Sequence, residues 1–112
     1  MIRVFVYGTL KKGFRNAYHL EDGRFLGEFV TGPIYSMYDF GGYPAVSENG
    51  KTAIEGEVYD ISEELLASID LLEVYPDFYQ RVMIETSFGG AWMYVVSEPL
   101  CADKIKISGS WL

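Results

Sequence analysis

The stretch SEELLASIDLLE, residues 62–73, decides the expected fold, because it carries the clearest helix signal of the chain. At about 100° per residue, its apolar side chains form one arc roughly 120° wide: Leu65, Leu66, Ile69 and Leu72. This arc predicts an amphipathic helix that packs on a core. Ser62 or Asp60 is the expected N-cap, and the Val-Tyr-Pro sequence of residues 74–76 ends the helix.

Glu73 projects inside this apolar arc, between Ile69 and Leu66, whereas the other acidic side chains of the stretch fall outside it. A carboxylate that faces a core must be hydrogen-bonded, paired with a cation or held with a raised pKa. A basic, poorly solvated carboxylate is what a general base requires. Glu73 is therefore the candidate catalytic residue. The alternative is that it lies in a frayed last turn and points to solvent.

Extended segments are predicted on both sides of the helix, at residues 2–7, 24–31, 34–39, 52–60, 79–88, 91–97 and 105–107. Asn49-Gly50 is expected to form a hairpin and Gly89-Gly90 a two-residue turn. Gly56, inside a predicted strand, indicates a bulge or a close backbone approach. Many strands around one principal helix predict an α+β fold, a compact mixed β-barrel of about six to seven strands, because closure protects strand edges.

The composition predicts a single domain over residues 1–112, in which 49% of residues are apolar and 22% charged. The net charge of −7 argues against nucleic-acid binding, which needs a basic surface. No apolar run has the length of a membrane span and no signal peptide is evident, so the expected location is cytoplasmic. The single cysteine, Cys101, cannot form an internal disulfide. The oligomeric state is left open.

Charge is unevenly distributed, because four cations precede the first acidic residue: Arg3, Lys11, Lys12 and Arg15. This positive segment could attract a small molecule that bears a carboxylate, or it could be a solvated turn. Within it, backbone N–H groups around Gly8, Thr9 and Leu10 could bind an anion or an oxyanion, because a glycine loop directly follows a predicted strand. Gly8 could equally do no more than make a turn.

Several chemistries are excluded by the residues themselves. One histidine and one cysteine cannot build an ordinary zinc site, and nothing resembles a Ser-His-Asp triad. Neither a P-loop nor a dinucleotide fingerprint is present. If the chain is an enzyme, we therefore expect it to work with carboxylate, backbone and tyrosine groups, without a metal or another cofactor.

Five motifs follow one another along nearly the whole chain. They are VYGTLKKG at residues 6–13 followed by Asn16, GYPA at residues 42–45, EGEVY at residues 55–59, IDLLE at residues 69–73 followed by Tyr75, Pro76, Tyr79 and Arg81, and SGSW at residues 108–111. In this order they resemble the gamma-glutamylcyclotransferase-like superfamily. The similarity is greatest to the branch of gamma-glutamylamine cyclotransferases and plant avirulence-induced-protein-like domains. Ser110 departs from the pattern, because an acid is common there.

The resemblance implies a mixed β-barrel with a flanking helix and a cavity between Glu73 and the loop of residues 7–10. It implies a small gamma-glutamyl substrate whose α-amine attacks its own side-chain carbonyl and yields 5-oxoproline and a released amine or amino acid. Glu73 is then the general acid and base, and no cofactor takes part. The implied substrate-binding residues are Tyr7, Gly8, Thr9, Leu10 and Tyr79.

Several alternatives remain open at this level. Tyr7 and Tyr79 could orient Glu73, line the pocket or be half-buried sheet residues, and Arg81 is expected in a structural ion pair. The fold could instead serve a non-catalytic module that binds a small molecule or peptide, or ring closure on another acyl group. The leaving amine is expected to be selected by the loop of residues 41–44 and by C-terminal residues.

Overall fold

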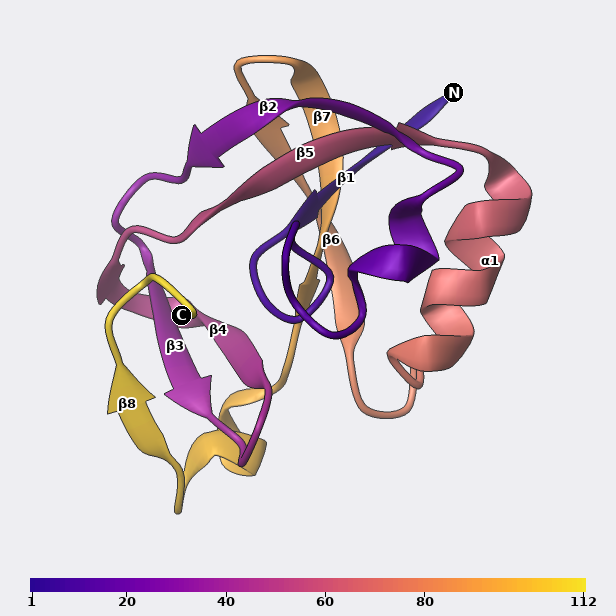
Figure 1. Ribbon diagram of the computed structural model, residues 1–112. Helices are drawn as coiled ribbons and strands as arrows, with labels where there is room; N and C mark the ends of the chain where they lie inside the picture. The colour runs from indigo at the N-terminus through magenta and orange to yellow at the C-terminus, as the bar shows by residue number, and fades with distance from the viewer.

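The computed structural model describes residues 1–112 and contains eight strands, one α-helix and two short 3-10 helices (Figure 1). The elements follow in the order β1 (Ile2–Val6), η1 (Ala17–Leu20), β2 (Arg24–Val30), β3 (Tyr35–Asp39), β4 (Pro44–Thr52), β5 (Glu55–Ile61), α1 (Glu63–Leu72), β6 (Gln80–Thr86), β7 (Gly89–Val95), η2 (Glu98–Cys101) and β8 (Ile105–Ile107).

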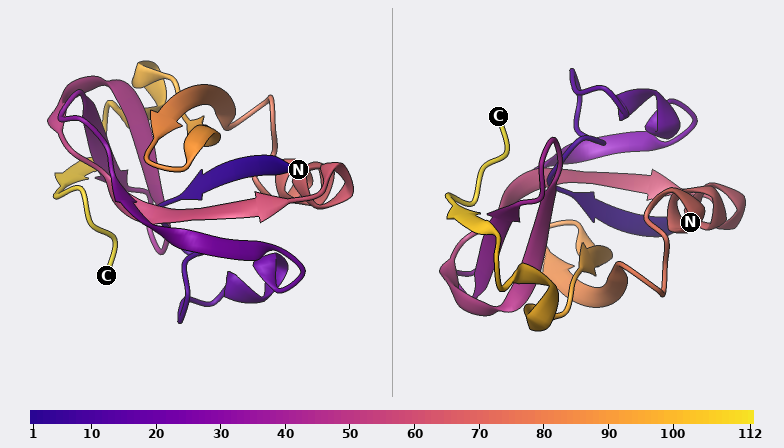
Figure 2. Two further views of the ribbon diagram at one scale, coloured as in Figure 1. Left: turned by 90° about the horizontal axis from the view of Figure 1, so that it is seen from above. Right: turned by 90° about the horizontal axis from the view of Figure 1, so that it is seen from below.

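The strands form two sheets. A five-stranded sheet has the order β2-β5-β1-β7-β6, in which β1 and β7 are parallel and the other neighbours antiparallel. A three-stranded antiparallel sheet has the order β4-β3-β8. Helix α1 and the three-stranded sheet lie at opposite ends of the molecule (Figures 1 and 2).

Strand β1 is the central strand of the larger sheet and is buried on both faces. Because side chains alternate along a strand, it supplies two separate cores. Val4 and Val6 join the cluster beneath α1 and η1, whereas Phe5 and Tyr7 join the cluster between the two sheets. The loop that follows β1 therefore starts in the middle of the molecule, where both cores meet.

Helix α1 has nearly the predicted bounds, but only two of the four residues in the predicted apolar arc are buried, because Leu65 is half-buried and Leu72 is exposed. The Ser62 hydroxyl accepts a hydrogen bond from the Leu65 N–H at 3.1 Å, so Ser62 is the N-cap and the alternative cap, Asp60, is not. Leu66 and Ile69 are buried against the sheet, and the helix ends at Leu72 with Glu73 as its C-cap. No helix of the protein has the length and apolar character that a membrane crossing would need.

The α+β class is confirmed, but the sheets do not close into the expected barrel. The three-stranded sheet packs on one face of the five-stranded sheet and buries an apolar cluster there, so closure is not needed to make a core. The edge strands β2 and β6 stay unpaired at their outer sides. A register shift at Leu26 in β2, and charged side chains on both edges, protect them from pairing with another chain.

Neither the expected hairpin at Asn49-Gly50 nor the expected two-residue turn at Gly89-Gly90 forms where it was predicted. Asn49-Gly50 lies inside β4. The neighbouring β3 residues Tyr35 and Ser36 pair with Thr52 and Ser47 of β4, so residues 48–51 between these two partners form an irregular bulge. The tight contact of Gly50 with the Tyr35 backbone favours this bulge over a free hairpin tip.

The second turn is made by Ser87-Phe88, two residues before the predicted Gly89-Gly90, because Thr86 already pairs with Gly89. The Thr86 hydroxyl accepts a hydrogen bond from the Phe88 N–H at 3.0 Å and donates one to the Gly89 carbonyl at 2.7 Å. A threonine side chain thus stabilises the turn that the two glycines were expected to make.

Candidate active site

A cavity of about 250 Å³ opens where the loop after β1, the loop before β4 and the C-terminal end of α1 meet. Its walls are mainly apolar and aromatic, with a small number of polar groups, which is the usual character of a small-molecule site. The lining residues come from segments far apart in the chain: residues 5–10, Arg15, Asn16, Tyr43, Pro44, residues 72–74, Phe78, Tyr79 and Tyr94.

The end of α1 fixes the position of Glu73. The Val74 N–H donates to the Leu71 carbonyl at 3.2 Å, and the Tyr75 N–H donates to the Asp70 carbonyl at 2.9 Å, which together form a Schellman motif. Val74 has a φ of 55°, a conformation that usually requires glycine and that strains a β-branched residue. The last turn is therefore closed and defined, so the frayed-turn alternative for Glu73 is wrong.

Burial raises the pKa of the Glu73 carboxyl to about 7. Its side chain is half-buried, accepts no hydrogen bond from another protein group and forms no salt bridge. Its place at the negative end of the helix dipole also disfavours the ionised form. The Glu73 carboxylate is therefore neither hydrogen-bonded nor paired with a cation, which leaves the third expected outcome, a raised pKa.

The loop after β1 brings three consecutive backbone donors to the same cavity. The N–H groups of Gly8, Thr9 and Leu10 make no hydrogen bond within the protein, although all three residues line the cavity. Such a run of free N–H groups can bind a carboxylate or a developing oxyanion. The expectation of an anion site in this loop is therefore consistent with the hydrogen bonding of the loop.

Contacts from both ends hold this loop in place. The Lys11 N–H donates to the Gly8 carbonyl at 3.1 Å, while Asn16 donates from its backbone N–H to the Thr9 carbonyl at 3.0 Å and from Nδ2 to the Thr9 Oγ1 at 2.9 Å. A Cβ atom added at Gly8 would lie only 2.7 Å from Cγ of Pro44. Glycine is thus required for the close approach of the two loops that form the cavity.

Tyr7 and Tyr79 both line the cavity, but neither hydroxyl binds Glu73. The Tyr7 hydroxyl donates to the Tyr94 carbonyl at 2.8 Å, and the Tyr79 hydroxyl donates to the Pro44 carbonyl at 2.6 Å. Burial and the nearby Glu73 carboxylate raise the pKa of both phenols, so both stay neutral near pH 7. Both tyrosines are buried in the cavity wall, and both hydroxyls donate to backbone carbonyls rather than to Glu73.

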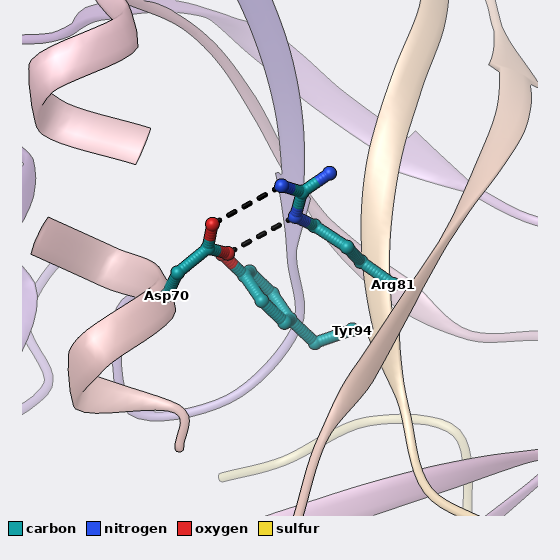
Figure 3. A network of polar contacts seen from close by, with 3 residues as sticks. All are labelled: Asp70, Arg81 and Tyr94. Atoms are coloured by element: carbon teal, nitrogen blue, oxygen red, sulfur yellow. Dashed lines mark hydrogen bonds and ion pairs between the residues drawn. The ribbon is translucent and has the colours of Figure 1, made fainter. Parts of the chain in front are cut away.

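A polar network behind the cavity joins α1 to the sheet. The Asp70 carboxylate accepts two hydrogen bonds from the Arg81 guanidinium, at 3.0 and 3.1 Å, and one from the Tyr94 hydroxyl at 2.6 Å (Figure 3). Arg81 also lies over the rings of Tyr75 and Trp92. The expected structural ion pair of Arg81 is confirmed, and it anchors the helix turn that carries Glu73.

We expect the variant Asp70→Asn to lower the free energy of unfolding by about 2 kcal/mol, because it leaves the half-buried guanidinium of Arg81 without its charge partner. The measurement is urea unfolding followed by tryptophan fluorescence at neutral pH. Glu63→Gln, which changes an exposed acid in the first turn of the same helix, is the control and should shift the free energy by less than about 0.5 kcal/mol. Equal midpoints for the two variants would contradict the anchoring role.

The positive segment of the sequence does not act as one patch. Arg3 pairs with Asp60 at 3.4 Å, the Lys12 ammonium lies 3.5 Å from the Phe25 ring centroid, and Lys11 donates from Nζ to the Trp111 carbonyl at 2.7 Å. Of the four cations, only Arg15 lines the cavity. The segment as a whole is therefore neither the carboxylate site nor the free solvated turn that the sequence left open.

The expected C-terminal contribution to the cavity is wrong, because no residue after Tyr94 lines it. The C-terminal motif instead supports the fold: the Gly109 carbonyl accepts a hydrogen bond from the Glu55 N–H at 2.9 Å, and the Trp111 carbonyl accepts one from the Lys11 ammonium. The loop of residues 41–44 does contribute, through Tyr43 and Pro44.

Sequence analysis missed the aromatic side of the cavity. Phe78 packs on Tyr79 at a centroid distance of 4.9 Å and on Tyr43 at 6.4 Å, and Tyr94 lies 6.2 Å from Tyr79. The only available signal was the density of aromatic residues around positions 75–79, since the approach of Tyr94 depends on the pairing of β7 with β1.

Comparison with known proteins places this arrangement in a family. Residues 4–112 match the family described as gamma-glutamyl cyclotransferase, AIG2-like. The gamma-glutamylcyclotransferase family protein YtfP of Escherichia coli K12 is 39% identical over 112 residues, which cover 99% of this chain and 96% of YtfP. These matches extend over the five motifs and over every segment that forms the cavity.

Solved structures share the fold. The solution NMR structure of ytfP from Escherichia coli has a TM-score of 0.79 at 38% identity and covers 99% of this chain and 96% of its own. The crystal structure of an AIG2-like protein from mouse has a TM-score of 0.86, covering 100% of this chain and 88% of its own, and at 23% identity it supports the fold alone. The resemblance carried by the ordered motifs is confirmed, and this chain belongs to the AIG2-like gamma-glutamyl cyclotransferase family.

Proposed function

We propose that this protein is a gamma-glutamyl cyclotransferase and that residues 1–112 act as one catalytic domain. It would convert a small gamma-glutamyl compound into 5-oxoproline and a free amine or amino acid. One observation carries the proposal: an unpaired carboxylate with a pKa raised to about 7 shares a cavity with three free backbone N–H groups. The names of the family and of YtfP support the same reaction class.

In this reaction the substrate supplies both the nucleophile and the electrophile. Its α-nitrogen forms a bond to the carbonyl carbon of its own side chain (Cδ), and the bond between that carbon and the leaving nitrogen then breaks. Because an α-amine is largely an ammonium near neutral pH, a base must first remove a proton. Glu73 takes this proton and returns it to the leaving nitrogen, and the second proton that the attacking nitrogen loses on ring closure passes to the released amine, so no water or redox partner is consumed.

The remaining cavity residues have supporting roles in the proposal. The N–H groups of Gly8, Thr9 and Leu10 bind the substrate carboxylate or the oxyanion that forms on the γ-carbonyl oxygen. Tyr7 and Tyr79 enclose the glutamyl group and exclude water, which keeps Glu73 basic. When the cavity holds the substrate's glutamyl group in a bent conformation, the amine lies close to the carbonyl, and such proximity lowers the barrier by several kcal/mol.

The test is to incubate the purified protein with gamma-glutamyl amines, gamma-glutamyl dipeptides and glutathione, and to detect 5-oxoproline by mass spectrometry. Product from the wild type, and none from Glu73→Gln, would support both the reaction class and the base. Binding of these compounds without any product would favour the alternative, a non-catalytic binding module.

We expect kcat/KM to rise with pH through about 7, because only the ionised Glu73 accepts a proton. Below that value the rate constant should change about tenfold per pH unit, and it should level off above it until the substrate amine itself titrates. Initial rates of 5-oxoproline formation at constant ionic strength measure this profile. A rising limb centred near 4.5, the ordinary value for a glutamic acid, would contradict the desolvated environment of the base.

A further inference from the structure

Arg15 is a cation of the cavity for which the proposed cyclisation has no role. It lines the cavity, forms no salt bridge and is exposed, so it lies at the mouth, whereas Tyr7 and Tyr79 are buried. Glu73 is the only acidic residue among the lining residues. The mouth therefore holds a guanidinium without a protein carboxylate to neutralise it.

The guanidinium of Arg15 lies beside the opposite loop. A Cβ atom at Gly42 would lie 3.5 Å from Nη1 and 3.9 Å from Nη2 of Arg15, so the guanidinium lies against the backbone of the loop before β4. Gly42 has a φ of 99° and no side chain, which leaves room for the guanidinium beside the loop. The side chain thus spans the mouth between the two loops that form the cavity.

The cavity is large enough to enclose only one half of a gamma-glutamyl substrate. At about 250 Å³ it is smaller than the roughly 300–1,000 Å³ of pockets that enclose drug-sized ligands. The glutamyl half must occupy the interior, because its amine has to reach Glu73 and the free N–H groups of residues 8–10 can take its carbonyl or carboxylate. The leaving half then lies at the mouth, beside Arg15.

We propose that Arg15 recognises a carboxylate on the leaving half, so that the preferred substrates are gamma-glutamyl amino acids or peptides rather than gamma-glutamyl derivatives of simple amines. This inference rests on the proposed cyclotransferase function. A guanidinium binds a carboxylate through two parallel N–H donors, and one such pair at a partly solvated site contributes about tenfold in selectivity.

The experiment compares gamma-glutamyl-alanine with gamma-glutamyl-alaninamide, which have nearly the same shape and differ in the charge of the leaving half. For the wild type we expect kcat/KM to be about tenfold higher for the acid. Arg15→Gln should reduce this ratio to about one by lowering the value for the acid while the value for the amide stays unchanged. High salt should weaken the preference of the wild type, because Arg15 is exposed.

Lys12→Gln is the matched control, because it removes the same charge from the same loop at a side chain that lies over Phe25 outside the cavity. It should keep the preference for the acid. If Arg15→Gln lowers kcat/KM equally for the acid and the amide, the guanidinium binds the glutamyl half and the proposal is overturned. An unchanged ratio in Arg15→Gln overturns it as well.

Failure of the cyclisation itself has a different signature. If the wild type forms no 5-oxoproline from either compound, the proposed function fails, and the affinities of the same two compounds are then measured by calorimetry. A tighter affinity for the acid that is lost in Arg15→Gln and kept in Lys12→Gln would still support carboxylate recognition at the mouth. Equal affinities for the acid and the amide would contradict it.

Discussion

Glu73→Gln is expected to lower kcat for 5-oxoproline formation by about 10³-fold, within the range that general acid–base groups contribute. Glutamine keeps the size and polarity of the side chain but cannot accept the proton of the substrate ammonium. The loop N–H groups and the cavity walls are unchanged, so substrate affinity should remain within about threefold of the wild type. Rates with a gamma-glutamyl substrate and calorimetric binding measure the two quantities separately.

The same variant is expected to be more stable than the wild type above pH 7. Burial raises the pKa of Glu73 from about 4.5 to about 7. Between these values the folded state holds a proton that the unfolded state has released, so the free energy of unfolding falls as pH rises and stays lower above pH 7. Because the side chain is only half-buried, we expect a gain of about 1–2 kcal/mol at pH 8 and little gain below pH 4.5.

Glu64→Gln is the control for both measurements, because Glu64 is an exposed acid on the same helix and lies outside the cavity. It should leave the rate of 5-oxoproline formation unchanged and should change the free energy of unfolding by less than about 0.5 kcal/mol. Retained turnover in Glu73→Gln would remove Glu73 as the base. A loss of stability at pH 8 in that variant would show that the carboxylate has a stabilising partner in the folded protein.

The features predicted well from sequence are those that depend on short stretches of chain. The helix over residues 62–73 combines an apolar period with a serine cap, and both signals are local. The same period placed Glu73 on the inner side of the helix, and it does line the cavity, whereas its role as the base stays a prediction. Strand β1 was predicted by alternation and by its β-branched and aromatic residues, although its burial on both faces follows only from its central place in the sheet.

The features that were missed depend on contacts between distant segments. Lys11 donates a hydrogen bond to the carbonyl of Trp111, a residue 100 positions away. Lys11 therefore does not form a positive patch with the other cations near it in the sequence. Asn49-Gly50 has the local chemistry of a hairpin, yet the packing of Gly50 on Tyr35 makes it part of a bulge. Two sheets form in place of a barrel for the same reason, since closure is decided by how the sheets pack.

Gly56→Ala is expected to destabilise the fold by about 3 kcal/mol or more. The sequence indicated a bulge or a close approach at Gly56, and the structure shows the close approach: an added Cβ would overlap the Val6 carbonyl oxygen and lie 2.7 Å from Cζ of Phe5. The Val6 oxygen belongs to the paired backbone of β1 and cannot move freely. The Phe5 ring is fully buried and packs edge-on against Phe29 at 5.9 Å, so it has little space to shift.

Gly32→Ala tests whether this loss comes from the contact or from glycine replacement in general. No atom lies within 4 Å of a Cβ added at Gly32, and its φ lies outside the left-handed region, so its stability should change by less than about 0.5 kcal/mol. Urea unfolding of both variants measures the difference. Because Val6 directly precedes the loop of residues 7–10, Gly56→Ala should also impair turnover at temperatures where it remains folded. Equal stability of the two alanine variants would mean that β1 and β5 can separate without cost, and the position of the cavity loop could then not depend on their close packing.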